Sequence, residues 1–172
     1  MSYGYIKLLL AAIFATIKSV QPSPISQFET PLKRNNQWLA KRLELIVAQY
    51  FPEVPISNRI LVRFFRISKS RLGSIALKPQ ANSAQSVTVI NINALFKDLT
   101  VPEYVIDTTL MHEFIHYGHG FNSPLAQKYR HPHLGGVVTK EFKARGAASI
   151  LKQQQKWIKT EYPKLLKQYG LL

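Results

Sequence analysis

The sequence predicts an α+β domain, because helical and strand-like patterns follow one another along the chain. Apolar residues recur at helical spacing in three segments, and they cluster or alternate as in strands in three others. The helical segments are residues 35–50, 107–117 and 139–169, and the strand-like segments are residues 60–67, 71–77 and 87–92. Three short strands that follow one another closely indicate a small sheet, and we expect the helices to flank it.

Local signals set the boundaries of the helices. Asp107 or Thr108 is the predicted N-cap of the second helix, because either side chain can accept a hydrogen bond from a free backbone N–H. The segment 139–169 is predicted to be one long helix or a pair of helices. Gly146 and Pro163 favour breaks within it, since neither residue suits the interior of a helix.

The chain divides into three parts by composition. Residues 1–20 are an apolar segment, either an N-terminal helix or a signal-like sequence, and residues 21–31 are predicted to be a linker. Residues 32–172 form the predicted folded domain. The apolar stretch in residues 1–20 is shorter than the roughly 20 residues that span a bilayer, so no stable membrane span is expected. We expect a cytoplasmic protein, with export or membrane association through residues 1–20 as the alternative.

The overall composition suits one globular domain and excludes several kinds of site. The chain has 172 residues, of which 46% are hydrophobic, which is enough for a sizeable core. It contains no cysteine. Disulfides, cysteine-ligated zinc and a cysteine nucleophile are therefore excluded within this sequence.

Positive charge dominates the chain and is unevenly distributed. The formal net charge is +14. Residues 61–100 contain six Lys or Arg against Asp98 alone, residues 141–172 contain seven against two acids, and residues 101–140 are neutral on balance. A surface of this kind suits a polyanion, meaning nucleic acid or an anionic membrane. DNA is therefore a candidate partner, through basic surfaces that flank residues 101–140.

Residues 112–116 read His-Glu-Phe-Ile-His and fall within the second predicted helix. Residues i and i+4 share a helix face, so His112 and His116 can both bind one metal ion. Glu113 lies about 100° further around the axis, where it can act as general base on a zinc-activated water. Gly118 and Gly120 favour a helix end just beyond the motif, and all five histidines lie between positions 112 and 133. The pattern predicts a Zn²⁺ site with Glu113 as its catalytic residue.

A catalytic zinc needs a third protein ligand and one open position. His119 is not expected to serve, because the helix is predicted to break before it. His133 is the first candidate, since the two glycines that follow Leu134 allow a tight turn. His131, which precedes a proline, and Glu141, a carboxylate from a downstream helix, are the alternatives.

At these motifs the chain resembles the SprT-like zinc metallopeptidases and related minimal zincins, over roughly residues 55–146. The shared elements are Arg71-Leu72-Gly73-Ser74-Ile75, Val87-Thr88-Val89-Ile90-Asn91-Ile92-Asn93, His112-Glu113-Phe114-Ile115-His116, and the later His133 with Phe142. The resemblance implies a minimal zincin-like fold, in which helices flank a small antiparallel sheet and the central helix carries HExxH, with a later histidine as third ligand. It also implies proteins crosslinked to DNA as substrates. Leu134 departs from the family pattern, in which glycine usually follows that histidine directly.

Two functions from different classes follow from these observations. The first is a zinc-dependent metallopeptidase that hydrolyses peptide bonds through a Glu-activated zinc-bound water, with DNA-associated proteins as candidate substrates. The second is a basic nucleic-acid-binding protein with a structural or vestigial zinc site. Two smaller expectations concern the strands: Gly73 marks a bulge or a close approach, and residues 87–92 are either a core strand or an edge strand that pairs with substrate.

Overall fold

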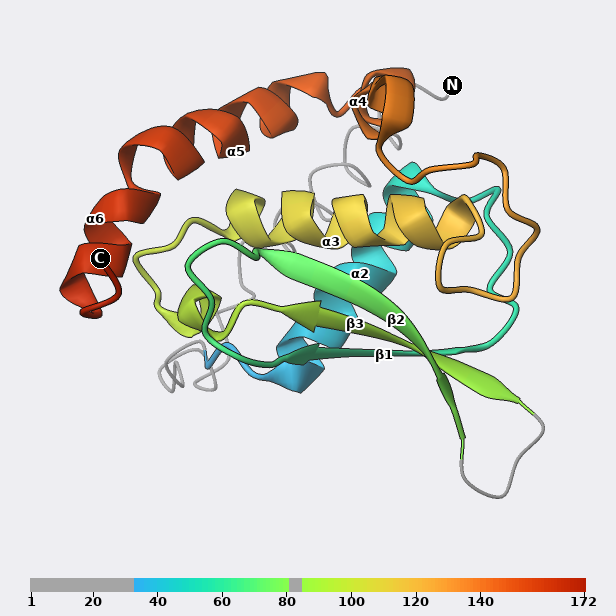
Figure 1. Ribbon diagram of the computed structural model, residues 1–172, viewed down its shortest axis with the longest axis horizontal. Coiled ribbons are helices and arrows are strands. Elements are labelled where there is room, and N and C mark those ends of the chain that lie inside the picture. Colours follow the sequence, from blue (N-terminus) through green and yellow to red (C-terminus); the bar gives the residue numbers. More distant parts are fainter. Residues whose placement is uncertain (1–32, 81–84) are drawn as a thin grey trace, which may run out of the picture. The chain divides into compact units, whose positions relative to one another are not determined.

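The computed structural model describes residues 33–80 and 85–172, which form five α-helices, two short 3-10 helices and a three-stranded sheet (Figure 1). The expectations for residues 1–20 and 21–31 fall outside the described residues. In chain order the elements are α2 (Asn36–Tyr50), β1 (Arg59–Phe64), β2 (Gly73–Pro79), β3 (Ser86–Ile92), η2 (Ala94–Lys97), α3 (Glu103–Gly118), η3 (Leu134–Gly136), α4 (Val137–Ala144), α5 (Ala148–Thr160) and α6 (Tyr162–Gln168). The α+β class is therefore confirmed.

The sheet is mixed, which corrects the expectation of an antiparallel sheet. Its strand order is β1-β3-β2, with β1 parallel and β2 antiparallel to β3. An alternation of apolar and polar residues is the same for both kinds of pairing, so the sequence pattern could not distinguish them. Because β3 is the central strand, the reading of residues 87–92 as an edge strand is wrong. Strand β2 is an edge instead, and no other described strand pairs with its outer side.

Helix α3 begins at Glu103, four residues before the earlier of the two predicted caps, and Pro102 occupies the N-cap. Both predicted cap residues lie inside the helix and make other contacts there. Asp107 pairs with Arg42 of α2, and the Thr108 hydroxyl donates to the Tyr104 carbonyl oxygen at 2.6 Å. Short polar side chains that cap helices can also bond within them or to a neighbouring helix, and tertiary pairing decides which occurs.

The segment 139–169 contains the end of α4, then α5 and α6. Gly146 has a φ of 71° in the turn between α4 and α5, where a left-handed conformation suits glycine. The second break falls at Glu161, and Pro163 lies in the first turn of α6, where its missing N–H costs nothing. Both breaks were expected near these residues, and the structure adds that α4 is a separate short helix.

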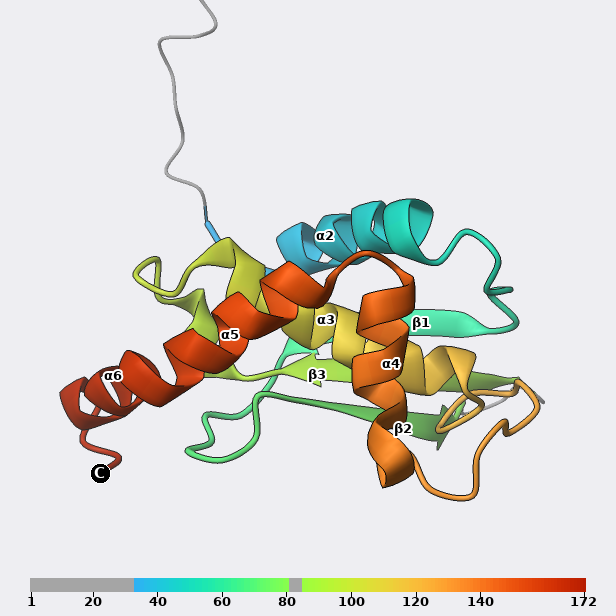
Figure 2. The same cartoon turned by 90° about the horizontal axis from the view of Figure 1, so that it is seen from above.

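One hydrophobic core joins the sheet to the helices. Helices α2 and α3 cover one face of the sheet, and α4 and α5 cross over α3 on its other side (Figures 1 and 2). The largest buried side chains include Phe114 of α3 and Phe96 of η2, both without solvent exposure. Phe96 meets the rings of Trp157 and Tyr162 edge-on, which fixes α5 and α6 to the core. Within the described part of the chain, no helix has the length and apolarity to cross a membrane.

Replacing Phe96 by Ala tests this account of the core. The change leaves a cavity beneath two aromatic rings, and we expect it to lower the free energy of unfolding by about 3 to 5 kcal/mol. Leu99→Ala is the matched control, because Leu99 is 62% exposed, and its effect should stay within about 0.5 kcal/mol. Denaturant titration measures both values. Equal effects for the two variants would contradict the packing described here.

Candidate metal centre

Helix α3 presents two imidazole rings to the same point. His112 and His116 lie one turn apart, and their Nε2 atoms are 3.1 Å from each other. Two nitrogens bound to one tetrahedral zinc at about 2.0–2.1 Å are roughly 3.3 Å apart. The separation in this structure is therefore close to the one that a shared metal ion requires.

His133 completes a group of three imidazoles. Its ring centroid lies 5.3 Å from that of His112 and 4.6 Å from that of His116, and one nitrogen of each residue falls within 4.8 Å of the others. Neither His131 nor Glu141 belongs to this group. Of the three candidates for a third ligand, His133 is the one that the fold brings to the histidine pair.

Burial keeps the two helix histidines in the form that binds metals. Desolvation, with the nearby His133 as a smaller contribution, lowers the pKa of His112 to about 4. Desolvation, followed by the charges of the neighbouring histidines, lowers the pKa of His116 to about 3. Both rings are therefore neutral at pH 7, and neutral imidazole nitrogens are metal ligands.

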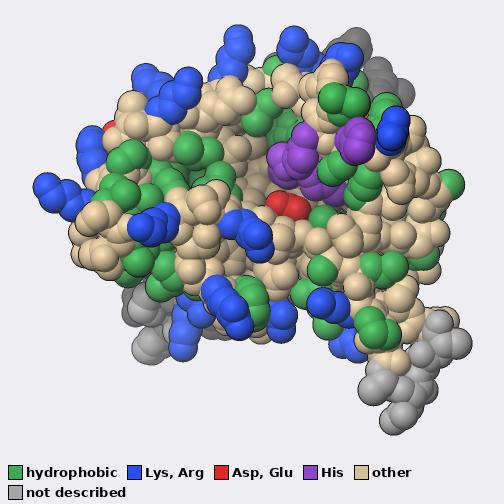
Figure 3. All heavy atoms as spheres, viewed as in Figure 1, with side chains coloured by type: hydrophobic (Ala, Val, Ile, Leu, Met, Phe, Trp, Pro, Cys, Tyr) green, Lys and Arg blue, Asp and Glu red, His purple; other side chains and the backbone are tan. Residues whose placement is uncertain are grey.

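Glu113 lies beside these rings in a pocket of about 240 Å³ that His112, Arg71 and Gln154 also line. Its side chain is buried, and desolvation raises the pKa of Glu113 to about 8, although the charge of Arg71 acts in the opposite direction. A buried carboxyl with such a shift is typical of a general acid or base. Figure 3 shows an acidic side chain in a hollow bordered by histidines.

Gly73 at the start of β2 gives the Glu113 side chain its room. A Cβ atom at position 73 would lie 2.7 Å from Glu113 Oε1 and 2.8 Å from Thr109 Cγ2, closer than side chains tolerate. The expected close approach at Gly73 is confirmed, and the group that approaches is the catalytic candidate itself. Sheet and helix therefore meet at the carboxylate, with no space for a larger residue between them.

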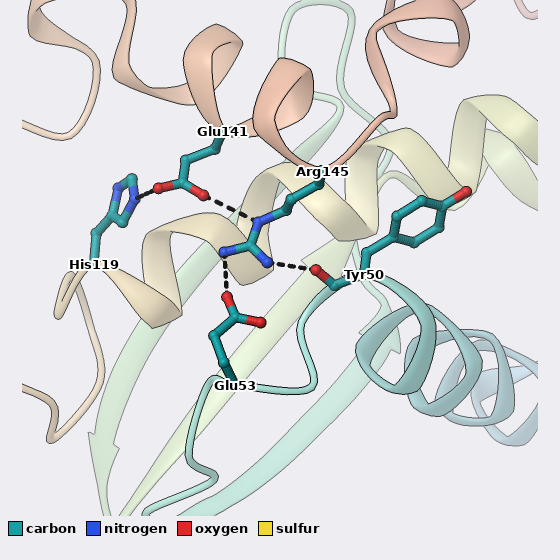
Figure 4. A network of polar contacts seen from close by, with 5 residues as sticks. All are labelled: Tyr50, Glu53, His119, Glu141 and Arg145. Atoms are coloured by element: carbon teal, nitrogen blue, oxygen red, sulfur yellow. Dashed lines mark hydrogen bonds and ion pairs between the residues drawn. The ribbon is translucent and has the colours of Figure 1, made fainter.

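Contacts with His119 anchor the segment that carries His133 on both of its sides, and Figure 4 shows the contact with Glu141 on the later side. Before it, the Lys128 N–H donates to the His119 carbonyl oxygen at 3.0 Å, and the Tyr129 ring packs 4.8 Å from the His119 ring. After it, Glu141 of α4 lies 2.9 Å from His119 Nε2. His119, the C-cap of α3, thus holds both ends of the segment in place.

Arg145 extends this network to α2. Its guanidinium contacts Glu141 at 3.0 Å, Glu53 at 2.7 Å and the carbonyl oxygen of Tyr50. Burial acts to raise the pKa of Glu141, but its hydrogen bond to His119 and the charge of Arg145 outweigh burial and hold that pKa below the usual range. Glu141, an alternative third ligand by sequence, therefore has a structural partner on each carboxylate oxygen.

Sequence reasoning missed two residues of the pocket. Gln154 comes from α5 and is buried, with Nε2 donating to Val105 O at 3.0 Å and to Thr109 Oγ1 at 2.9 Å. Arg71 follows β1 in the chain and reaches the pocket from the segment that leads into β2. No spacing in the sequence links either residue to the motif, because their approach depends on how α5 and the sheet pack on α3.

The pKa values of the site predict how the metal-free protein responds to pH. The pKa of Glu113 is about 8 when folded against 4.5 unperturbed, so between these values the folded state binds more protons and stability falls as pH rises. The lowered pKa values of His112 and His116 make stability rise with pH, but only below about pH 6.5. Between pH 6.5 and 8, chelator-treated protein should lose about 1 to 2 kcal/mol of stability.

Denaturant titration across this pH range measures the effect, and Glu113→Gln is the test variant. Because glutamine does not ionise, the variant should show an almost flat profile above pH 6.5. A wild-type profile that rises over this range, or the same fall in the variant, would contradict a buried carboxyl with a raised pKa.

The arrangement combines three convergent imidazoles with one buried carboxyl, the set of groups that metal-assisted hydrolysis uses. One open position would remain at a metal ion that the three rings hold in tetrahedral geometry. The resemblance to SprT-like metallopeptidases rests on the motifs of the chain, because comparison with family models, curated proteins and solved structures gave no match.

Proposed function

We propose that the protein is a zinc-dependent metallopeptidase in which His112, His116 and His133 hold the metal and Glu113 is the general base. One observation carries the proposal: three convergent imidazoles, two of them kept neutral by burial, adjoin a buried carboxyl with a raised pKa. Such a carboxyl is costly to bury and has no role in a purely structural zinc site. Its position beside the histidines favours catalysis over the nucleic-acid-binding alternative.

The residues have separate tasks in this mechanism. Zinc would supply a Lewis acid that acidifies water and polarises the scissile carbonyl group. Glu113 takes the proton from the attacking water and later delivers it to the leaving nitrogen. Because Gly73 has no side chain, the Glu113 carboxylate has room beside β2. Burial excludes bulk water from this carboxylate. The positive charge of a bound metal ion would lower the pKa of Glu113 and so restore its basic form at neutral pH.

The surrounding fold supports a peptide as substrate. Strand β2 begins at Gly73 beside Glu113, and its outer edge has free backbone N–H and C=O groups as far as the described strands extend. An extended peptide can add to such an edge through main-chain hydrogen bonds. The motif helix packed against a small sheet with this open edge supports the proposal of a peptide substrate.

The first prediction concerns the metal. Purified protein should bind close to one equivalent of zinc, and His133→Ala should weaken zinc affinity by at least about a hundredfold, because one of three ligands is lost. His131→Ala is the matched control and should change affinity less than about threefold, since His131 lies outside the group. Competition with a chromogenic chelator measures both. Native protein with less than about a tenth of an equivalent of zinc would sink the metal proposal.

The second prediction concerns the base. Glu113→Gln should retain zinc but lower the hydrolysis of an unfolded protein substrate by about a thousandfold or more, because glutamine cannot take a proton. Glu103→Gln, which changes a partly exposed acid in the first turn of the same helix, is the control and should keep its activity. Turnover by Glu113→Gln at the wild-type rate would remove Glu113 from the mechanism.

A further inference from the structure

The sheet and its connecting segments carry positive charge only. Between Glu53 and Asp98 the chain contains no acidic residue, although it includes Arg63, Arg66 and Arg71. Every described acid lies elsewhere, on the helices or in the segments next to them. In Figure 3, Lys and Arg side chains lie around the hollow, whereas the acidic colour on this face is almost confined to the hollow itself.

A groove of about 570 Å³ lies next to the candidate metal centre. Four residues, Ser70, Arg71, Leu72 and Gly73, line both this groove and the Glu113 pocket, so the two adjoin along this segment. Across the groove, Arg63 of β1, Asn91 of β3 and Ser74 of β2 form a row on the sheet face opposite the core. Arg63 Nε donates to Asn91 Oδ1 at 2.9 Å, which fixes its guanidinium over the sheet.

The cations of this groove have no acidic partner. Arg63, Arg66, Arg71 and Lys78 are exposed, and none of the ion pairs among the described residues includes them. Arg63 and Arg66 both pack on the ring of Phe65, at 4.6 Å and 5.1 Å from its centroid. These contacts restrict two long side chains, so a ligand would lose less conformational freedom on pairing with them.

We propose that this cationic groove binds the acidic side chains of an extended peptide and makes the protein selective for acidic segments, an inference that rests on the peptidase function proposed above. A peptide with its scissile bond at Glu113 and its backbone along β2 passes the segment from Ser70 to Gly73. Side chains of its neighbouring residues would then reach the groove that Arg63, Arg66 and Arg71 line. Carboxylates there would pair with cations that take part in no ion pair among the described residues.

The groove suits an acidic peptide better than a single-stranded nucleic acid. Such a strand binds by stacking its bases on exposed aromatic rings as well as by phosphate contacts. Phe65 is the exposed ring of this groove, and two guanidinium groups already lie over it. The site therefore offers charge without a free stacking surface, and it adjoins the Glu113 pocket, where a peptide substrate would lie.

Matched peptides test the proposal. One extended sequence is made with Glu, Gln or Lys at three successive positions, in one series before the scissile bond and in another after it. In one of the two series, kcat/KM for the Glu peptide should exceed that for the Gln peptide by about tenfold, with the Lys peptide slowest, because exposed charge pairs each contribute little. The preference should shrink as salt is raised from 50 mM to about 500 mM, because salt screens exposed charges.

Charge reversal locates the effect. Arg66→Glu should lower the Glu-to-Gln ratio by about tenfold or invert it, because repulsion replaces attraction. Lys159→Glu makes the same change of net charge on an exposed residue of α5 and should leave the ratio unchanged. Equal ratios in the two variants would overturn the assignment of the groove.

Measurements of peptide binding test the acidic preference separately from the proposed peptidase reaction. Fluorescence anisotropy with zinc-loaded Glu113→Gln protein measures affinity for the same peptides without turnover. Cleavage of all three peptides at equal rates overturns the acidic preference alone. Tighter binding of the Glu peptide without any cleavage by wild type supports the groove and contradicts the peptidase. A single-stranded oligonucleotide that binds more than about tenfold tighter than the Glu peptide, and displaces it, would overturn the peptide as occupant.

Discussion

The packing of α3 between the sheet and α5 is the constraint on which the rest of the site depends. This helix must fill the core with residues such as Leu110 and Phe114 while its other face presents two imidazoles and a carboxyl. Close packing on both sides removes water from these polar groups, and desolvation then keeps the rings neutral and shifts the carboxyl towards its protonated form. One packing arrangement thus sets both the geometry of the site and its proton affinities.

The two candidate metal ligands on α3 and the carboxyl could be named from the sequence because they belong to one helix, where spacing determines direction. His112, Glu113 and His116 have fixed relative positions once residues 103–118 are helical. His133 could only be ranked among alternatives, because no periodic element joins it to the pair. What selects it is the anchoring of its segment on His119, because Glu141 pairs both with His119, 22 residues away in the sequence, and with the nearby Arg145.

In the sheet, too, local sequence patterns predict the elements, whereas their arrangement depends on contacts between distant segments. Apolar clustering located three strands to within a few residues, but the position of β3 in the middle depends on how the segments between strands cross, which alternation does not encode. Gly73 was predictable in part. Its residue type indicated a close approach, and only the packing of β2 on α3 identified Glu113 as the neighbour. The side chains that line a site are thus less predictable than the elements that carry it.

The nitrogen-only ligand set has a consequence for how a metal would be lost. Thiolate sites release zinc when oxidants convert the sulfur ligands to disulfides or sulfenic acids. Imidazoles do not follow that route, and this chain has no cysteine at all. Occupancy of the site would therefore be insensitive to the redox poise of the surroundings. It would respond to acidity and to competing chelators, because protons are what displace a metal from neutral imidazole nitrogens.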